Sequence, residues 1–142
     1  TRRRNFGSDL ARGQMATLAA RIDQRRRVHD HYRRCLGELP GVQFQAVPAG
    51  CEPNFWLTTV QLDPDAFGAP SADVLAALRA EAIEARPGFM PMHMQPVFAD
   101  HPRVGGAVSA AHFANSVSLP SSGRLTSDDV QTIVDVVLAA RR

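Results

Sequence analysis

The chain contains no lysine, so that all sixteen of its basic residues are arginine. A Schiff base to a carbonyl substrate or to an aldehyde cofactor needs an amine side chain. No side chain of this sequence can supply that amine. Any chemistry that passes through a lysine must therefore take place on another chain or on another part of a longer one.

Cysteines and long apolar runs are also scarce. The two cysteines, Cys35 and Cys51, are far apart in the sequence and do not form the pattern of a disulfide framework. We therefore expect a reducing, cytoplasmic location. No apolar run approaches the ~20 residues that a membrane-spanning helix needs, and no signal-peptide pattern is present. Because the sequence starts at Thr1 and not at methionine, we expect a further segment upstream.

The length of 142 residues suits one domain, and 44% hydrophobic with 21% charged residues is typical of globular proteins. Positive charge is concentrated at the front: residues 1–34 hold ten arginines against three aspartates, and the remainder is net acidic. A basic segment can indicate nucleic-acid binding. Arg25, Arg26 and Arg27, however, lie on different sides of a helix, and the segment has few aromatic residues. We expect a solvated or partner-facing helix and no nucleic-acid partner.

Hydrophobic periodicity predicts a long helix over residues 8–37, with Ser8 as its N-cap. Its length predicts either a kink near Gly13 or a helix that runs along a neighbouring domain or subunit. We expect strands at 42–45, 55–62, 83–86 and 117–119, and helices at 71–82, 108–115 and from Thr126 onward. This order predicts an α+β fold over residues 1–142. A small, mostly antiparallel sheet would carry helices on one face and follow the long helix.

The segment 84–98 holds three prolines together with Arg86 and His93. Proline fixes its own backbone and pushes the preceding residue toward extended geometry, which predicts a stiff loop. Such a loop can hold Arg86 and His93 in fixed places as binding groups. The alternative is an ordinary crossing loop whose apolar side chains fill the core: Phe89, Met92, Val97 and Phe98.

Two groups of side chains have metal-ligand chemistry. His29, His31 and Cys35 lie close together on the first predicted helix, but a structural zinc site needs four ligands and no nearby pair completes it. The methionines around His93 suit Cu(I), yet methionine is also the usual filler of irregular core gaps. We therefore expect no metal site. Nucleophile-elbow, P-loop and dinucleotide-binding motifs are absent as well.

Several short segments match, in order, those of one known family. They are Arg12–Met15, Leu39–Val42, Asn54–Thr59, Leu62–Pro64, Ile83–Pro87, Pro91–Phe98, Val104–Gly106, Leu119–Ser121 and Leu125–Thr126. Together they resemble the C-terminal part of the DegT/DnrJ/StrS-type sugar aminotransferases, which are pyridoxal-phosphate enzymes of the aspartate-aminotransferase fold (fold type I).

This resemblance implies an enzyme that moves an amino group, usually from glutamate, to a nucleotide-linked keto sugar for polysaccharide or antibiotic biosynthesis. It also implies a homodimer with active sites at the subunit interface. The lysine that binds pyridoxal phosphate would belong to an upstream large domain, which is missing from this chain. The expected partners are therefore that large domain, a second copy and the nucleotide-sugar substrate.

The resemblance also assigns residues. Arg86 and His93 match the family's loop and are carried over as substrate-binding groups. An arginine suits phosphate or carboxylate through its planar fork of donors, and His93 can donate to a sugar hydroxyl. Arg2 falls on a segment near the cofactor phosphate and is carried over as cofactor-binding, although the tyrosine and serine of that segment are not matched. No catalytic residue is expected in this chain.

A second hypothesis is a free-standing, non-catalytic remnant that binds a protein partner or a nucleotide sugar through the old interface. The missing lysine fits both hypotheses. Exposed apolar surface where a large domain would dock favours the aminotransferase hypothesis. A self-contained polar surface favours the remnant.

Overall fold

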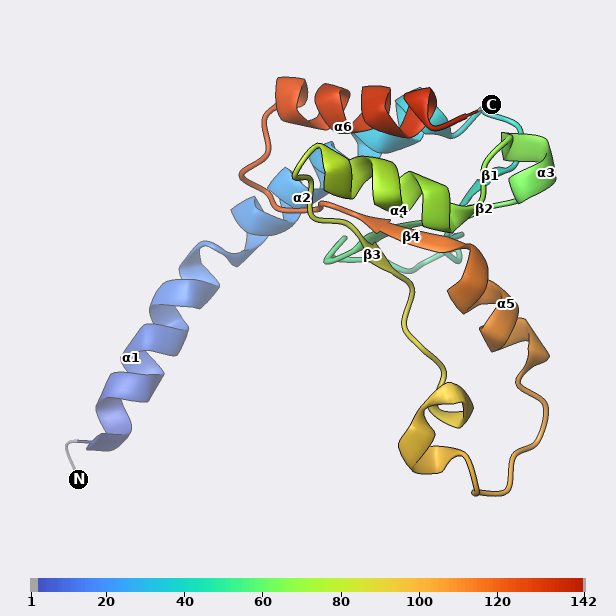
Figure 1. Ribbon diagram of the computed structural model, residues 1–142. Helices are drawn as coiled ribbons and strands as arrows, with labels where there is room; N and C mark the ends of the chain where they lie inside the picture. The colour runs from blue at the N-terminus through green and yellow to red at the C-terminus, as the bar shows by residue number, and fades with distance from the viewer. Residues whose placement is uncertain (1–2, 142) are drawn as a thin grey trace.

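The computed structural model describes residues 3–141 and begins with two consecutive helices, α1 (Arg3–Ala16) and α2 (Leu18–Leu36). The predicted N-cap at Ser8 is wrong, because Ser8 lies inside α1. The helix breaks at Thr17 and not near Gly13. The Thr17 hydroxyl donates to the carbonyl of Gln14 at 3.1 Å, a local bond that competes with regular helical pairing. Beyond this break, α1 points away from the rest of the molecule (Figure 1).

Four strands form one sheet in the order β1–β2–β4–β3, and all three neighbouring pairs are antiparallel. The strands are β1 (Val42–Phe44), β2 (Thr58–Leu62), β3 (Arg86–Pro87) and β4 (Ser116–Leu119). The α+β class with a small antiparallel sheet, predicted from the sequence, is confirmed.

Two strands are shorter than predicted because of the backbone beside them. Phe55 has a φ of 50°, which a strand residue cannot adopt, and β2 starts only at Thr58. Ala82 has a φ of 56°, and the Ile83 N–H bonds back to the Leu78 carbonyl at 2.9 Å. Ile83 therefore closes the preceding helix, and β3 is reduced to two residues.

Helices α2, α4 (Ser71–Ala80) and α6 (Ser127–Ala139) form a layer beside the sheet, and α6 packs on both α2 and α4 (Figure 1). Alternate residues of β2 enter the core, namely Thr58, Val60 and Leu62. The helices contribute apolar residues at helical spacing, as α2 does with Val28, Tyr32 and Leu36. No helix within residues 3–141 is both long enough and apolar enough to cross a bilayer.

Between β3 and β4 the chain leaves the sheet and returns, forming what we call the arm (residues 88–106) (Figure 1). The arm contains two short 3₁₀ turns, η1 (Met92–Met94) and η2 (Pro96–Phe98), and leads into α5 (Ala107–Asn115). The expectation that its apolar residues fill the core is wrong for Phe89, Met92 and Val97, which are 81%, 59% and 70% exposed.

One further short helix, α3 (Pro64–Phe67), was not predicted, although Asp63 and Pro64 mark its start. The Asp63 carboxylate accepts the backbone N–H groups of Asp65 and Ala66, as an N-cap does. The turn before β1 packs on this helix at Gly41, whose φ is 77°. A Cβ there would lie 2.8 Å from the Asp63 carbonyl oxygen.

Gly41→Ala is expected to lower the free energy of unfolding by about 3 kcal/mol, since left-handed strain and a backbone clash act together. Gly50 is the matched control: its φ is 79°, but nothing lies within 4 Å of an added Cβ. Gly50→Ala should cost only about 1 kcal/mol. Urea unfolding of both variants measures the difference, and equal losses would show that packing against α3 contributes nothing.

Candidate functional site

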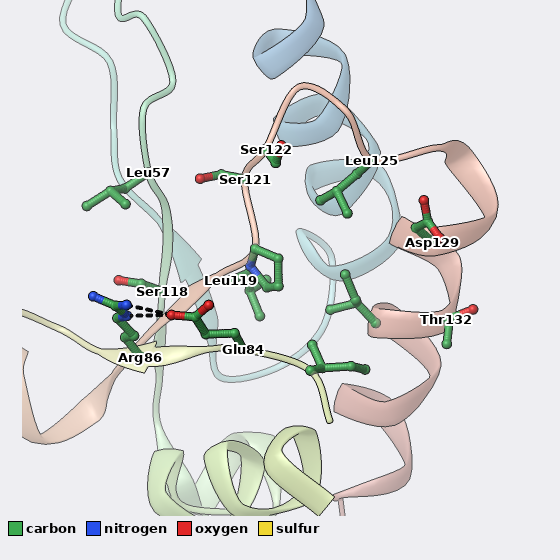
Figure 2. A pocket seen from close by; sticks show the side chains of 13 residues that line it. Leu57, Glu84, Arg86, Ser118, Leu119, Ser121, Ser122, Leu125, Asp129 and Thr132 are labelled. Atoms are coloured by element: carbon green, nitrogen blue, oxygen red, sulfur yellow. Dashed lines mark hydrogen bonds and ion pairs between the residues drawn. The ribbon is translucent and has the colours of Figure 1, made fainter. Parts of the chain in front are cut away.

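A cavity lies where β3, β4 and the start of α6 meet, and we call it the Arg86 pocket. Its volume is about 530 Å³, within the range of small-molecule sites. The lining residues are Leu57, Ile83, Glu84, Arg86, Ser118, Leu119, Pro120, Ser121, Ser122, Leu125, Asp129, Thr132 and Ile133. Figure 2 shows Arg86 and Glu84 on one side of the pocket, with Asp129 and Thr132 on the other. The strand β3 with the segment that leads into it, and the helix α6, thus hold the charged groups around an apolar floor.

Arg86 is the only cationic side chain among these lining residues. Its Nη2 lies 2.5 Å from Oε1 of Glu84, and its Nε lies 3.1 Å from the same oxygen. Both side chains are more than three-quarters exposed, at 77% and 76%. An ion pair this exposed contributes little stability and exchanges readily with a competing anion. The guanidinium is therefore oriented by Glu84 and still open to a carboxylate or phosphate.

Asp129, the second acid in the pocket, is part of a helix cap. Its carboxylate accepts the Thr126 backbone N–H and hydroxyl, each at 2.8 Å, and its own N–H donates to the Thr126 hydroxyl. These hydrogen bonds hold the pKa of Asp129 below its usual value, and the bond from the Thr126 backbone has the largest effect. The prediction that Thr126 and the following acids open the last helix is confirmed. Asp129 therefore has a structural role in the helix cap. Its lowered pKa favours the ionised carboxylate, which cannot act as a general acid.

The turn Pro120–Arg124, which forms one wall of the pocket, is held from two sides. The hydroxyl of Tyr32 on α2 donates to the Pro120 carbonyl at 2.9 Å. The Ser121 hydroxyl donates to the Trp56 carbonyl at 2.7 Å. Tyr32 is completely buried, and burial raises the pKa of its hydroxyl far above the usual value, so the donor keeps its proton at neutral pH. The wall is thus fixed to α2 and to the loop before β2.

His93 does not line the Arg86 pocket. It lies on η1 in the arm, where its ring packs on Gly106 just before α5; a Cβ at Gly106 would be 2.8 Å from Cε1 of His93. The structure therefore does not bring Arg86 and His93 together within this chain. Arg2 lies outside the described residues.

Sequence reasoning missed the polar residues opposite Arg86, chiefly Ser122 and Thr132. Thr132 carries no local signal, because it is one exposed polar position on an amphipathic helix. The segment Leu119–Pro120–Ser121 was noticed only as part of a family pattern.

A second cavity of about 400 Å³ lies beneath the loop 45–57, beside His29. The His29 ring is 9% exposed and packs 4.5 Å from the ring of Phe55 and 5.6 Å from that of Phe44, measured between centroids. Its Nδ1 is 3.5 Å from the Thr58 hydroxyl. Burial lowers the pKa of His29. This histidine is a core residue that needs to stay neutral, and within residues 3–141 no three His, Cys, Asp or Glu side chains gather as metal ligands.

This burial predicts a pH dependence of stability. The unfolded chain takes up a proton on His29 near the ordinary pKa of 6.5, whereas the folded chain does so only at lower pH. The stability is therefore complete above about pH 6.5 and falls as the pH drops from there toward the lowered pKa. We expect the urea midpoint to fall between pH 7.5 and pH 5.5, and to fall less in His29→Gln. An equal fall in His31→Gln and the wild type is the control result, since His31 lies on the same helix but is only half-buried.

Comparison with known proteins identifies the family. The model of the DegT/DnrJ/EryC1/StrS aminotransferase family matches residues 2–138. The chain belongs to this family. It is 33% identical over 139 residues to EpsN of Bacillus subtilis, which is described by its name as a pyridoxal phosphate-dependent aminotransferase. The match covers 94% of this chain and 35% of EpsN.

Solved structures of the DegT/DnrJ/EryC1/StrS type have the same fold. DesI, solved with its TDP-sugar product, superposes with a TM-score of 0.81 at 27% identity, over 90% of this chain and 33% of DesI. DesV of S. venezuelae, solved with a ketimine intermediate, superposes with a TM-score of 0.78 at 22% identity, over 94% of this chain and 35% of DesV. The chain thus spans about a third of the length of the relatives it matches.

Aminotransferases of the DegT/DnrJ/EryC1/StrS family depend on pyridoxal phosphate. The residues of this chain do not make the cofactor's covalent site, because the sequence has no lysine. In the described part, the Arg86 pocket offers one guanidinium, already oriented by a carboxylate, and no second cation for a phosphate. This chain therefore cannot supply the cofactor's covalent anchor.

Proposed function

We propose that this chain is the C-terminal small domain of a pyridoxal-phosphate aminotransferase that aminates a nucleotide-linked keto sugar. The family membership supports this proposal, and so does the TDP-sugar bound to DesI, at 27% identity. The observation that carries it is the Arg86 pocket, whose single exchangeable cation lies above an apolar floor. The amino donor proposed is glutamate.

In this proposal Arg86 binds an anionic group of the substrate or the amino donor. A carboxylate can accept two parallel hydrogen bonds from a guanidinium. Glu84 uses only Oε1, which accepts from both Nε and Nη2 of Arg86. An incoming carboxylate would replace Glu84 as the partner. His93 is placed on the arm, so it would reach the substrate only where the arm contacts the large domain or a second copy. We propose that it donates to a sugar hydroxyl there.

The apolar surface supports a missing large domain and a second copy as the partners. The arm exposes Phe89, Met92 and Val97, and α1 exposes Leu10 and Met15 at 59% and 66%. A globular protein rarely leaves neighbouring apolar side chains this open unless another surface covers them. The free-standing, non-catalytic remnant predicts a polar surface in these places, and the exposed side chains weigh against it.

The experiment is an amination assay with the chain joined to its lysine-bearing large domain, identified through the intact mass or a co-purifying chain. A nucleotide-linked keto sugar, glutamate and pyridoxal phosphate should give the amino sugar, followed by mass spectrometry. Arg86→Gln should lower kcat/KM by at least tenfold, because one bidentate charged pair is lost. Arg79→Gln, an exposed arginine of α4 outside the pocket, is the matched control and should leave kcat/KM unchanged.

If the joined enzyme binds pyridoxal phosphate but aminates no nucleotide-linked sugar, the proposed substrate is wrong. If no lysine-bearing partner restores any transamination, the non-catalytic reading replaces the proposal.

A further inference from the structure

A third pocket, of about 430 Å³, lies between the start of α2 and the turn Ser122–Arg124. We call it the three-arginine pocket because Arg21, Arg25 and Arg124 line it. The other lining residues are Thr17, Ala20, Gln24, Ser122 and Gly123, so the lining contains no acidic side chain. None of the three arginines forms an ion pair with a described carboxylate. Three unneutralised guanidinium groups around one hollow create a strongly positive potential.

Specific contacts hold the residues of this pocket in place, so the three arginines are not a chance cluster of surface charge. Arg25 is half-buried, and Arg21 is oriented by its Nε, which donates to the Thr17 hydroxyl at 3.2 Å. Gly123 is pressed on α2: a Cβ added there would lie 2.8 Å from Cβ of Gln24. The Ser122 hydroxyl accepts the Arg124 backbone N–H at 3.3 Å, which keeps the turn closed. The break between α1 and α2 at Thr17 forms the remaining side.

Ser122 lines both this pocket and the Arg86 pocket. The turn Pro120–Arg124 therefore has one pocket on each side, and a ligand that passes over Ser122 would touch both. One side offers an apolar floor with one exchangeable cation, and the other offers three guanidinium groups with no acidic side chain in the lining. A substrate with a sugar at one end and two phosphates beside it has the matching distribution of charge.

We infer that the three-arginine pocket binds the diphosphate of the nucleotide-linked substrate, with the sugar directed toward the Arg86 pocket. The inference rests on the proposed function for the identity of the ligand. Arginine is suited to this task because its planar fork donates two parallel hydrogen bonds to phosphate oxygens. The pocket sets the preference for a nucleoside diphosphate conjugate over a free sugar.

The test is isothermal titration calorimetry of the full chain with inorganic pyrophosphate, UDP, TDP and uridine at fixed, low salt. The three phosphate compounds should bind, and uridine should not. Arg25→Gln and Arg124→Gln should each weaken pyrophosphate binding about tenfold, the loss expected for one charge-assisted contact. Gly123→Ala should also weaken pyrophosphate binding, with no change of charge, because the added Cβ pushes the turn away from α2. The urea midpoint of this variant shows whether the loss of binding comes from unfolding.

Arg79→Gln removes the same charge outside both pockets and should leave the affinity unchanged. An equal loss in Arg79→Gln would mean non-specific attraction and would overturn the inference. So would the absence of pyrophosphate binding, or binding that Arg25→Gln and Arg124→Gln leave intact. If the phosphates bind as expected but the joined enzyme aminates no nucleotide-linked sugar, the proposed function fails and the anion site stands.

Discussion

The burial of Tyr32 is the constraint on which both pockets depend. This side chain is completely buried in the core, and its hydroxyl donates to the Pro120 carbonyl. A buried hydroxyl without a partner costs about 1–3 kcal/mol. The bond therefore fixes where the chain must leave β4, and with it the position of the turn that both pockets share. Core packing and ligand geometry are set here by one contact.

The two pockets divide the chemistry of a bipolar ligand between them. The Arg86 pocket is largely apolar, with a cation that a neighbouring carboxylate holds in place but does not bind tightly. The three-arginine pocket is strongly charged instead, and no acidic side chain lines it. Neither contains an amine that could form a Schiff base, because the sequence has no lysine.

The sequence predicted the parts of the fold that follow from local rules. The strand at Val42 and the capped helix after Thr126 were found because alternation and capping are short-range patterns. The helix break was misplaced, since glycine suggested Gly13 and the competing bond formed at Thr17. Arg86 was singled out from the proline-rich segment and from resemblance to a family motif, and it lines a pocket. The pairing of Arg21 with Arg124 was missed because the two are 103 residues apart in sequence, and only tertiary packing brings them to one pocket.

The two-residue length of β3 has a consequence for how this protein can associate. Sheets often join by adding a strand at an open edge, which needs a row of free N–H and C=O groups. At this edge the row is only Arg86 and Pro87, and proline has no N–H to donate. Continuous β-pairing between copies is therefore blocked at the border that carries Arg86. That side of the sheet remains available to a ligand and is protected from edge-to-edge aggregation.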